Sequence, residues 1–163
     1  MDAFFATITW FGSLYLLLPS SVLLSLLFLR AGRQREAVFL ALSLTVSVIA
    51  VHAVKLLFRR PRPDFPDMLV PMPTDWSFPS AHTTQATAFF LSLTLIAIRH
   101  LPPFWAACTA LISLLLTAGV GYSRVYLQVH YLSDVLAGMI LAILLVLLVQ
   151  AVFPHLHLPS SRN

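Results

Sequence analysis

Five long apolar runs dominate the chain, and its polar residues are concentrated between them. The runs cover residues 3–29, 37–58, 80–98, 104–122 and 130–153. Because an α-helix rises about 1.5 Å per residue, a run of about 20 apolar residues crosses the roughly 30 Å hydrocarbon core of a bilayer. Helices also satisfy their own backbone hydrogen bonds, as a membrane requires. The pattern therefore predicts an all-α integral membrane helix bundle of about five transmembrane helices, forming one membrane-embedded domain over residues 1–163.

The first run can be interpreted as a crossing helix or as a cleaved signal peptide. A signal peptide begins with basic residues and has an apolar region of about 7–15 residues. Here Asp2 precedes the run, and the run is longer than that, with Pro19-Ser20-Ser21 as its only interruption. We therefore expect residues 3–29 to form one tilted crossing, because the run is too short for two.

The connection between the second and third runs, residues 59–79, differs from the others. It is long and contains six of the eleven prolines, whereas the links at 30–36 and 99–103 are short. Proline lacks a backbone N–H and blocks helix formation, so we expect an extended, stiff loop that lies outside the membrane or caps its surface. Arg59 and Arg60 at its start are expected to meet anionic lipid head groups.

Composition supports a membrane protein and removes several other classes. Apolar residues make up 59% of the chain and charged residues 10%, with a mean hydropathy of +0.88. Soluble globular domains usually contain about 25% charged residues. The net charge of +4 would suggest nucleic acid in a soluble protein, but here the basic residues lie in short loops, so no nucleic-acid partner is expected. The single cysteine, Cys108, excludes an internal disulfide framework.

Several ionisable residues lie near the ends of the apolar runs, where they are costly and therefore candidates for function. They are Lys55, Arg62, His82, Arg124, His130 and Asp134. If the five helices cross the membrane alternately, all six residues fall on the same face. The short links at 30–36 and 99–103 and the C-terminal tail fall on the other face.

The distribution of Lys and Arg predicts which face is outside, since these residues are enriched in cytoplasmic loops. One face carries Arg30, Arg33, Arg35, Arg99 and Arg162, and the other carries Lys55, Arg59, Arg60, Arg62 and Arg124. This tie of five to five becomes five to two if a site holds Lys55, Arg62 and Arg124. We then expect the candidate residues to face outward, with the N-terminus outside and the C-terminus inside.

Two local patterns suggest chemistry, and each also has a structural explanation. His130 and Asp134 are four residues apart at the start of a helix, so the carboxylate can orient the imidazole for nucleophilic attack. A buried hydrogen bond would explain that pair equally well. Ser80 suits the N-cap of a helix whose free N–H groups attract anions, with His82 in its first turn. A capped helix with a histidine at the membrane surface is the alternative.

Three cations, Lys55, Arg62 and Arg124, join these histidines on the same face. Lys55 alone could be a lysine that extends towards the interface from a helix end. Three cations beside a helix N-terminus and two histidines fit a phosphate better than a carboxylate or a sugar. The combination predicts a phosphate pocket.

These residues resemble the three motifs of the type 2 phosphatidic acid phosphatase superfamily, the membrane lipid phosphatases related to vanadium haloperoxidases. The first motif, Lys, six residues and Arg-Pro, is matched by Lys55 and Arg62-Pro63. The second, Pro-Ser-Gly-His, is nearly matched by Pro79-Ser80-Ala81-His82. The third, Ser-Arg, five residues, His, three residues and Asp, is matched by Ser123-Arg124, His130 and Asp134.

The resemblance implies a two-step phosphoryl transfer that needs no metal and no other cofactor. By similarity, His130 attacks phosphorus to form a phosphohistidine, Asp134 orients the imidazole and His82 protonates the leaving oxygen. The phosphoryl oxygens would be bound by Lys55, Arg62, Arg124, Ser80 and the backbone N–H of Ala81. Such an arrangement stabilises negative charge that spreads over the phosphoryl group in the transition state.

The sequence departs from the family pattern in two ways. Ala81 replaces the glycine of the second motif, which is harmless in a right-handed helix and strained at positive φ. The family commonly has six core helices, one more than the five predicted here, and the missing one would be the first. The family-like core therefore covers about residues 37–153.

The expected function is hydrolysis of a membrane lipid phosphate or diphosphate at the outer face of a bacterial inner membrane. Undecaprenyl diphosphate is the first candidate substrate, followed by phosphatidylglycerophosphate and phosphatidic acid. One alternative is an enzyme with a metal bound by His82, His130 and Asp134, which the nearby cations would oppose. Another is a non-enzymatic phospholipid-binding or transport protein that uses the same cations.

Overall fold

The computed structural model describes residues 1–64 and 69–152. Its elements are α1 (Asp2–Ile8), the 3₁₀ helix η1 (Thr9–Gly12), α2 (Leu14–Arg30), α3 (Gln34–Phe58), α4 (Ala81–His100), α5 (Pro103–Tyr126) and α6 (Leu132–Val152). No strand occurs within these described ranges. Pro66, Phe153 and Arg162, which belong to the loop, core and charge predictions, lie outside the described residues.

The predicted all-α membrane bundle is confirmed. Helices α3, α4, α5 and α6 are each long and apolar enough to span a membrane. The segments Asp2–Gly12 and Leu14–Arg30 form a fifth span if they are counted together, and they are bent by 43° where they meet. The bend falls at Ser13, which is extended, while Pro19 lies inside α2. The protein is an integral membrane protein whose first apolar run is bent, in place of the single tilted helix expected from the sequence.

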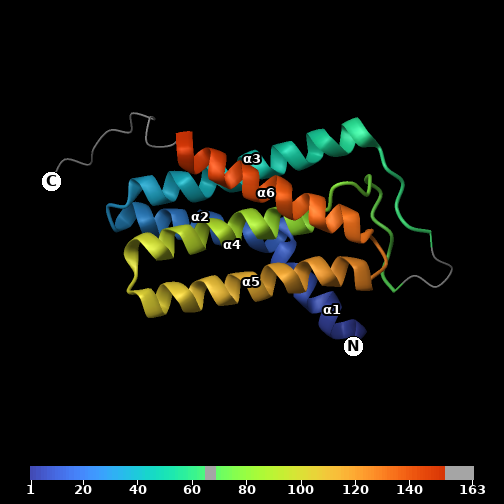
Figure 1. Ribbon diagram of the computed structural model, residues 1–163, viewed down its shortest axis with the longest axis horizontal. Helices are drawn as coiled ribbons and strands as arrows, with labels where there is room; N and C mark the ends of the chain where they lie inside the picture. Colours follow the sequence, from blue (N-terminus) through green and yellow to red (C-terminus); the bar gives the residue numbers. More distant parts are fainter. Residues whose placement is uncertain (65–68, 153–163) are drawn as a thin grey trace.

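Helix α4 lies at the centre of the bundle (Figure 1). It packs against α2, α3, α5, α6 and η1. Over their most apolar parts, helices α3, α5 and α6 are 22–39% buried, whereas α4 is 67% buried. Leu114 on α5 and Leu144 on α6 are exposed, as side chains that face lipid should be. Residues Thr83, Thr84 and Gln85 in the first turns of α4 are accordingly buried.

The two ends of the bundle differ in their connections (Figure 1). Residues 31–33 and 101–102 make short links at one end. Residues 59–64, 69–80 and 127–131 lie together at the other end. The described parts of the proline-rich loop, 59–64 and 69–80, contain no helix, in agreement with the prediction. All six ionisable candidates lie at this second end, as expected from alternating crossings.

Two glycines allow the close approaches that form this end. A Cβ at Gly138 of α6 would lie 2.9 Å from the carbonyl oxygen of Ser80 and 2.8 Å from the hydroxyl of Thr84. A Cβ at Gly12 of η1 would lie 2.7 Å from the carbonyl oxygen of His82. Both contacts are too short for a side chain, so α6 and η1 pack directly on the backbone at the start of α4.

Candidate active site

His130 and Asp134 form a buried pair at the junction before α6. Their exposed fractions are 3% and 0%, and Nδ1 of His130 lies 3.4 Å from Oδ2 of Asp134. His130 precedes α6 by two residues, so it lies just outside the helix start that the spacing predicts. The Asp134 carboxylate also accepts hydrogen bonds from the backbone N–H of Tyr131 at 3.0 Å and from the hydroxyl of Ser77. These bonds fix the carboxylate and, through it, the plane of the imidazole.

The other ring nitrogen of His130 is held in an acceptor role. Nη1 of Arg62 lies 3.2 Å from Nε2 of His130 and also donates to the carbonyl oxygen of Val129 at 2.7 Å. Because a guanidinium only donates, Nε2 carries a lone pair and Nδ1 carries the proton towards Asp134. Burial lowers the pKa of His130 to about 4, with Asp134 opposing that shift and nearby Arg62 and Arg124 adding to it. The imidazole is therefore neutral and nucleophilic near pH 7.

A cavity of about 210 Å³ joins His130 to the start of α4. Its lining includes His130, His82, Ala81, Arg62, Arg124 and Asp75. The two histidines come from different segments, His130 from the α5–α6 link and His82 from the first turn of α4. The cavity therefore presents two imidazoles and two guanidinium groups to one small volume.

Ser80 is the N-cap of α4, as the sequence predicts. Its hydroxyl oxygen accepts hydrogen bonds from the Thr83 backbone N–H at 3.5 Å and the Thr83 hydroxyl at 3.0 Å. Ser80 is fully buried, and its backbone N–H donates to the carbonyl oxygen of Asp134 at 3.0 Å. Its side chain therefore caps α4 and its backbone ties α4 to α6, while the neighbouring Ala81 lines the cavity.

Ala81, which stands where the family motif has glycine, causes no backbone strain. It is the first residue of α4, and the non-glycine residues with positive φ in the described chain are Arg59 and Gln128. A right-handed helical residue accepts a Cβ freely. The departure in the second motif therefore leaves the helix N-terminus intact.

Arg124 is buried in the last turn of α5 and reaches the cavity. It is 6% exposed, and its Nη1 donates to the hydroxyl of Thr9 in η1 at 2.8 Å. Its Nε is buried and finds no hydrogen-bond partner within the part of the chain that the structure describes. A buried charged donor without a partner is costly, so this nitrogen is suited to an anionic ligand. No sequence pattern indicates Thr9, because nothing in the first run marks it as a contact of Arg124.

Lys55 and Arg62 meet at a third residue, Asp75, which the sequence analysis also missed. Nζ of Lys55 lies 2.9 Å from Oδ2 of Asp75, and Nη2 of Arg62 forms an ion pair with Oδ1. Nζ of Lys55 also donates to the carbonyl oxygen of Trp76. Burial raises the pKa of Asp75, but its hydrogen bonds and ion pairs with Lys55 and Arg62 lower that pKa more, so the carboxyl is ionised.

Arg60 corrects one prediction. It was expected to meet lipid head groups, but its Nη1 donates to Oδ1 of Asp134 at 2.7 Å and to the hydroxyl of Ser133 at 2.8 Å. Its guanidinium lies 4.0 Å from the centre of the Tyr131 ring. The two ends of the loop are joined to each other, since the Ser77 N–H donates to the Arg60 carbonyl oxygen at 2.9 Å. Both residues also contact Asp134 of α6. Arg60 and Ser77 therefore support the carboxylate that orients His130.

The structure thus assembles the six ionisable candidates around a single site. Arg62 contacts His130, His130 contacts Asp134, and Asp75 joins Arg62 to Lys55. His82 and Arg124 complete the cavity. The arrangement can bind a tetrahedral anion with cations on one side and present a neutral imidazole nitrogen to its central atom.

Comparisons with known proteins agree with this geometry. Residues 36–157 match the family model of the PAP2 superfamily. The chain is 29% identical over 146 residues to phosphatidylglycerophosphatase B of Bacillus subtilis, covering 88% of this chain and 70% of the relative. It is 31% identical over 135 residues to an undecaprenyl-diphosphatase of Sulfolobus acidocaldarius, covering 80% of this chain and 60% of the relative.

A solved structure has the same fold. The crystal structure of a transmembrane PAP2-type phosphatidylglycerolphosphate phosphatase from Bacillus subtilis superposes with a TM-score of 0.86 at 28% sequence identity. The match covers 95% of this chain and 77% of that one. Because the family model spans most of the chain and the bundle superposes on a family structure, the protein belongs to the PAP2 superfamily of phosphatases.

Proposed function

We propose that the protein is a membrane lipid phosphatase that acts through a phosphohistidine at His130. One observation carries the proposal: Arg124, whose buried Nε has no partner among the described residues, shares a cavity with His82 and His130. A buried guanidinium and a neutral imidazole directed at one small volume suit a phosphoryl group. The names of two related proteins, a phosphatidylglycerophosphatase and an undecaprenyl-diphosphatase, support a lipid phosphate or diphosphate as substrate.

In the first step, Nε2 of His130 attacks phosphorus and the bond from phosphorus to the lipid oxygen breaks. His82 donates a proton to that oxygen, and the lipid product leaves. As the N–P bond forms, positive charge develops on the imidazole, and Asp134 at 3.4 Å stabilises it. In the second step, water attacks the phosphohistidine, His82 takes back a proton and inorganic phosphate is released. The net reaction consumes one water molecule and restores both histidines.

The cations stabilise the charge that spreads over the phosphoryl oxygens during both steps. Arg124 and Arg62 line the cavity, and Lys55 lies next to Arg62 across Asp75. We propose that these residues carry out the reaction without a metal ion. In support, the described residues contain no group of three or more His, Cys, Asp and Glu side chains that could hold a metal.

The position of the site at helix ends favours a substrate whose tail remains in the bilayer. We propose undecaprenyl diphosphate first, then phosphatidylglycerophosphate or phosphatidic acid. Four of the five cations at this end, Lys55, Arg60, Arg62 and Arg124, are engaged by the site. The opposite end carries Arg30, Arg33, Arg35 and Arg99 as exposed charges. The positive-inside rule then supports a site on the exterior face of a bacterial inner membrane.

Phosphate release by the detergent-purified protein, measured across a panel of lipid phosphates and diphosphates with excess chelator, tests this function. We expect turnover of at least one of the three proposed lipids at an undiminished rate in chelator. Loss of activity in chelator, restored by one added metal, would contradict the metal-free mechanism. Binding of the same lipids without any phosphate release would instead show a binding or transport protein.

A further inference from the structure

Asp75 occupies the cations that the proposed function assigns to phosphate. Its two carboxylate oxygens each take one cation, Oδ2 at 2.9 Å from Nζ of Lys55 and Oδ1 in an ion pair with Arg62. Its own carbonyl oxygen accepts a further bond from Nε of Arg62 at 2.8 Å. Asp75 also lines the cavity that contains His82 and His130. The carboxylate thus binds these cations with two oxygens, as a phosphoryl group would.

The two cations need a negative partner even in the absence of substrate. Lys55 is 2% exposed, and a buried ammonium without a counter-charge is strongly unfavourable. The Asp75 side chain is 47% exposed, so its carboxylate can turn towards solvent. The bond from Arg62 to the backbone carbonyl does not depend on that carboxylate, and it can hold the loop in place while the side chain leaves. Asp75 is therefore placed to exchange with an incoming anion.

The charge of the incoming group decides the result of such an exchange. A phosphate monoester or a diphosphate carries about two or more negative charges near pH 7, since the second pKa of a phosphate is about 6. A phosphodiester, the linkage of ordinary membrane phospholipids, carries one. Replacing one carboxylate by a singly charged diester gains no Coulomb energy, whereas replacing it by a dianion does. An enzyme surrounded by phosphodiester head groups benefits from that distinction.

We propose that Asp75 is a specificity-determining residue: a built-in competitor that keeps phosphodiester head groups out of the site and yields to doubly charged phosphate monoesters and diphosphates. This inference rests on the proposed function of the same site. It also explains why a carboxylate, which repels phosphate, lies inside a phosphate pocket. The loop contributes this competitor through residue 75 and supports the nucleophile through Ser77.

Inhibition constants of inorganic phosphate and of a short-chain phosphatidylglycerol, measured on hydrolysis of a short-chain phosphatidic acid, test the proposal. We expect Asp75→Asn to strengthen inhibition by both anions about tenfold or more, with the larger change for the phosphodiester. Asp75→Glu retains the charge and should stay within about threefold of wild type. Asp64→Asn, a neutralised carboxylate in the same loop, is the matched control and should change neither constant.

A positioning role for Asp75 predicts the opposite result. If the carboxylate mainly orients Lys55 and Arg62, Asp75→Asn weakens inhibition by both anions and lowers kcat, which would overturn the proposal. Unchanged constants would also overturn it. If Asp75→Asn fails to fold, Asp75→Ser provides the same neutral comparison. Wild-type protein that neither hydrolyses the lipid nor binds phosphate would contradict the proposed function itself, a result that is distinct from these.

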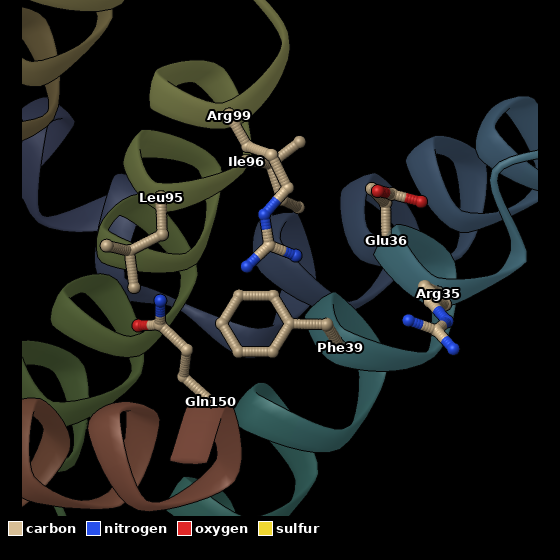
Figure 2. Close-up of a pocket in the computed structure, with 7 residues that line it drawn as sticks. All are labelled: Arg35, Glu36, Phe39, Leu95, Ile96, Arg99 and Gln150. Atoms are coloured by element: carbon tan, nitrogen blue, oxygen red, sulfur yellow. The ribbon is translucent and has the colours of Figure 1, made fainter. Parts of the chain in front are cut away.

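A second cavity, of about 360 Å³, lies at the opposite end of the bundle (Figure 2). Arg35 from the first turn of α3 and Arg99 from the last turn of α4 line it. The Arg99 guanidinium lies above the ring of Phe39 in this view, and Gln150 lies beside that ring (Figure 2). The acidic residue in the lining, Glu36, forms an ion pair with His100 at 2.6 Å. The cavity therefore combines two guanidinium groups and an amide with an apolar wall.

We infer that this cavity binds the head-group phosphate of an anionic phospholipid. Basic pockets between transmembrane helices are suited to such head groups. Arg35 lies at the N-terminal end of α3, where the helix dipole is unfavourable for a cation and favourable for an anion. The N-cap of α3, Arg33, makes no side-chain capping bond, and the Glu36 carboxylate accepts a bond from its own backbone N–H in the first turn.

Native mass spectrometry of the detergent-purified protein with added phosphatidylglycerol or phosphatidylcholine tests this second inference. We expect Arg35→Gln combined with Arg99→Gln to weaken phosphatidylglycerol binding about tenfold, while Arg30→Gln at the same end leaves it unchanged. Equal binding of phosphatidylcholine, or no effect of the double variant, would overturn the inference. Displacement of the lipid by millimolar inorganic phosphate would instead identify a site for free phosphate.

Discussion

The two ends of the helix bundle both carry basic residues, but in different surroundings. At the site end, Lys55 and Arg124 are 2% and 6% exposed and contact Asp75 and Thr9. At the opposite end, Arg33 and its basic neighbours are exposed. A buried cation needs oxygen atoms as partners. An incoming anion must displace those partners, which restricts the anions that can bind. An exposed cation is hydrated and binds head groups or marks the topology. Burial, rather than the number of cations, distinguishes the candidate site from the opposite end.

Replacing the proposed nucleophile, His130, should have the largest effect. We expect His130→Ala to lower kcat by at least about a thousandfold, because no other group at the site forms the covalent intermediate. His100→Gln, at the opposite end, should retain activity within about threefold although it breaks the pair with Glu36. Phosphate release and thermal unfolding of both variants check this contrast. Comparable losses in the two variants would show that the two ends are not functionally distinct.

Removing the unpaired guanidinium should have the next largest effect. We expect Arg124→Gln to lower kcat/KM about a hundredfold, since a donor directed at developing charge is lost. Arg99→Gln is the matched change at the opposite end and should leave kcat/KM nearly constant. Steady-state kinetics on one lipid phosphate provide the measurement. A small effect of Arg124→Gln would mean that its Nε does not contact the phosphoryl group.

Loss of the support behind Asp134 should have an intermediate effect. Arg60→Gln removes a 2.7 Å bond to Oδ1, but the bonds from Tyr131 and Ser77 to Oδ2 remain. We expect kcat to fall about tenfold with KM almost unchanged, because Arg60 acts through the carboxylate and not on substrate. Arg59→Gln is the neighbouring control. A rise in KM without a fall in kcat would place Arg60 on the substrate instead.

The pH dependence should show the smallest effect. The attacking imidazole has to be neutral, and burial lowers the pKa of His130 from the usual 6.5 of a histidine to about 4. Below that pH the ring is protonated, so the acidic limb of kcat/KM should have its midpoint near pH 4, with about half the activity lost there. The same shift makes folding stability decline as the pH falls from 6.5 towards 4. An acidic limb with a midpoint near 6.5 would indicate an exposed His130.

Much of the site could be predicted because its residues lie in short sequence patterns. His130 and Asp134 are four residues apart, so their contact needs only one helical turn of chain. The position of Ser80 directly before an apolar run predicts its capping role. Thr9, Ser77 and Asp75 have no such pattern, because their partners lie between 13 and 115 residues away along the chain. Their contacts depend on how η1 and the proline-rich loop fold back over the helix ends.

The sequence by itself determined the class of the protein. Long apolar runs impose membrane-spanning helices, because a run of about 20 apolar residues satisfies its own backbone hydrogen bonds as a helix. Alternating crossings then bring the charged helix ends to one face. The tertiary structure alone decided which of these charges are buried and what neutralises them. It placed Arg60 on Asp134 and Asp75 on Lys55 and Arg62. Those pairings follow from the path of an irregular loop, whose conformation is set by distant packing and not by local periodicity.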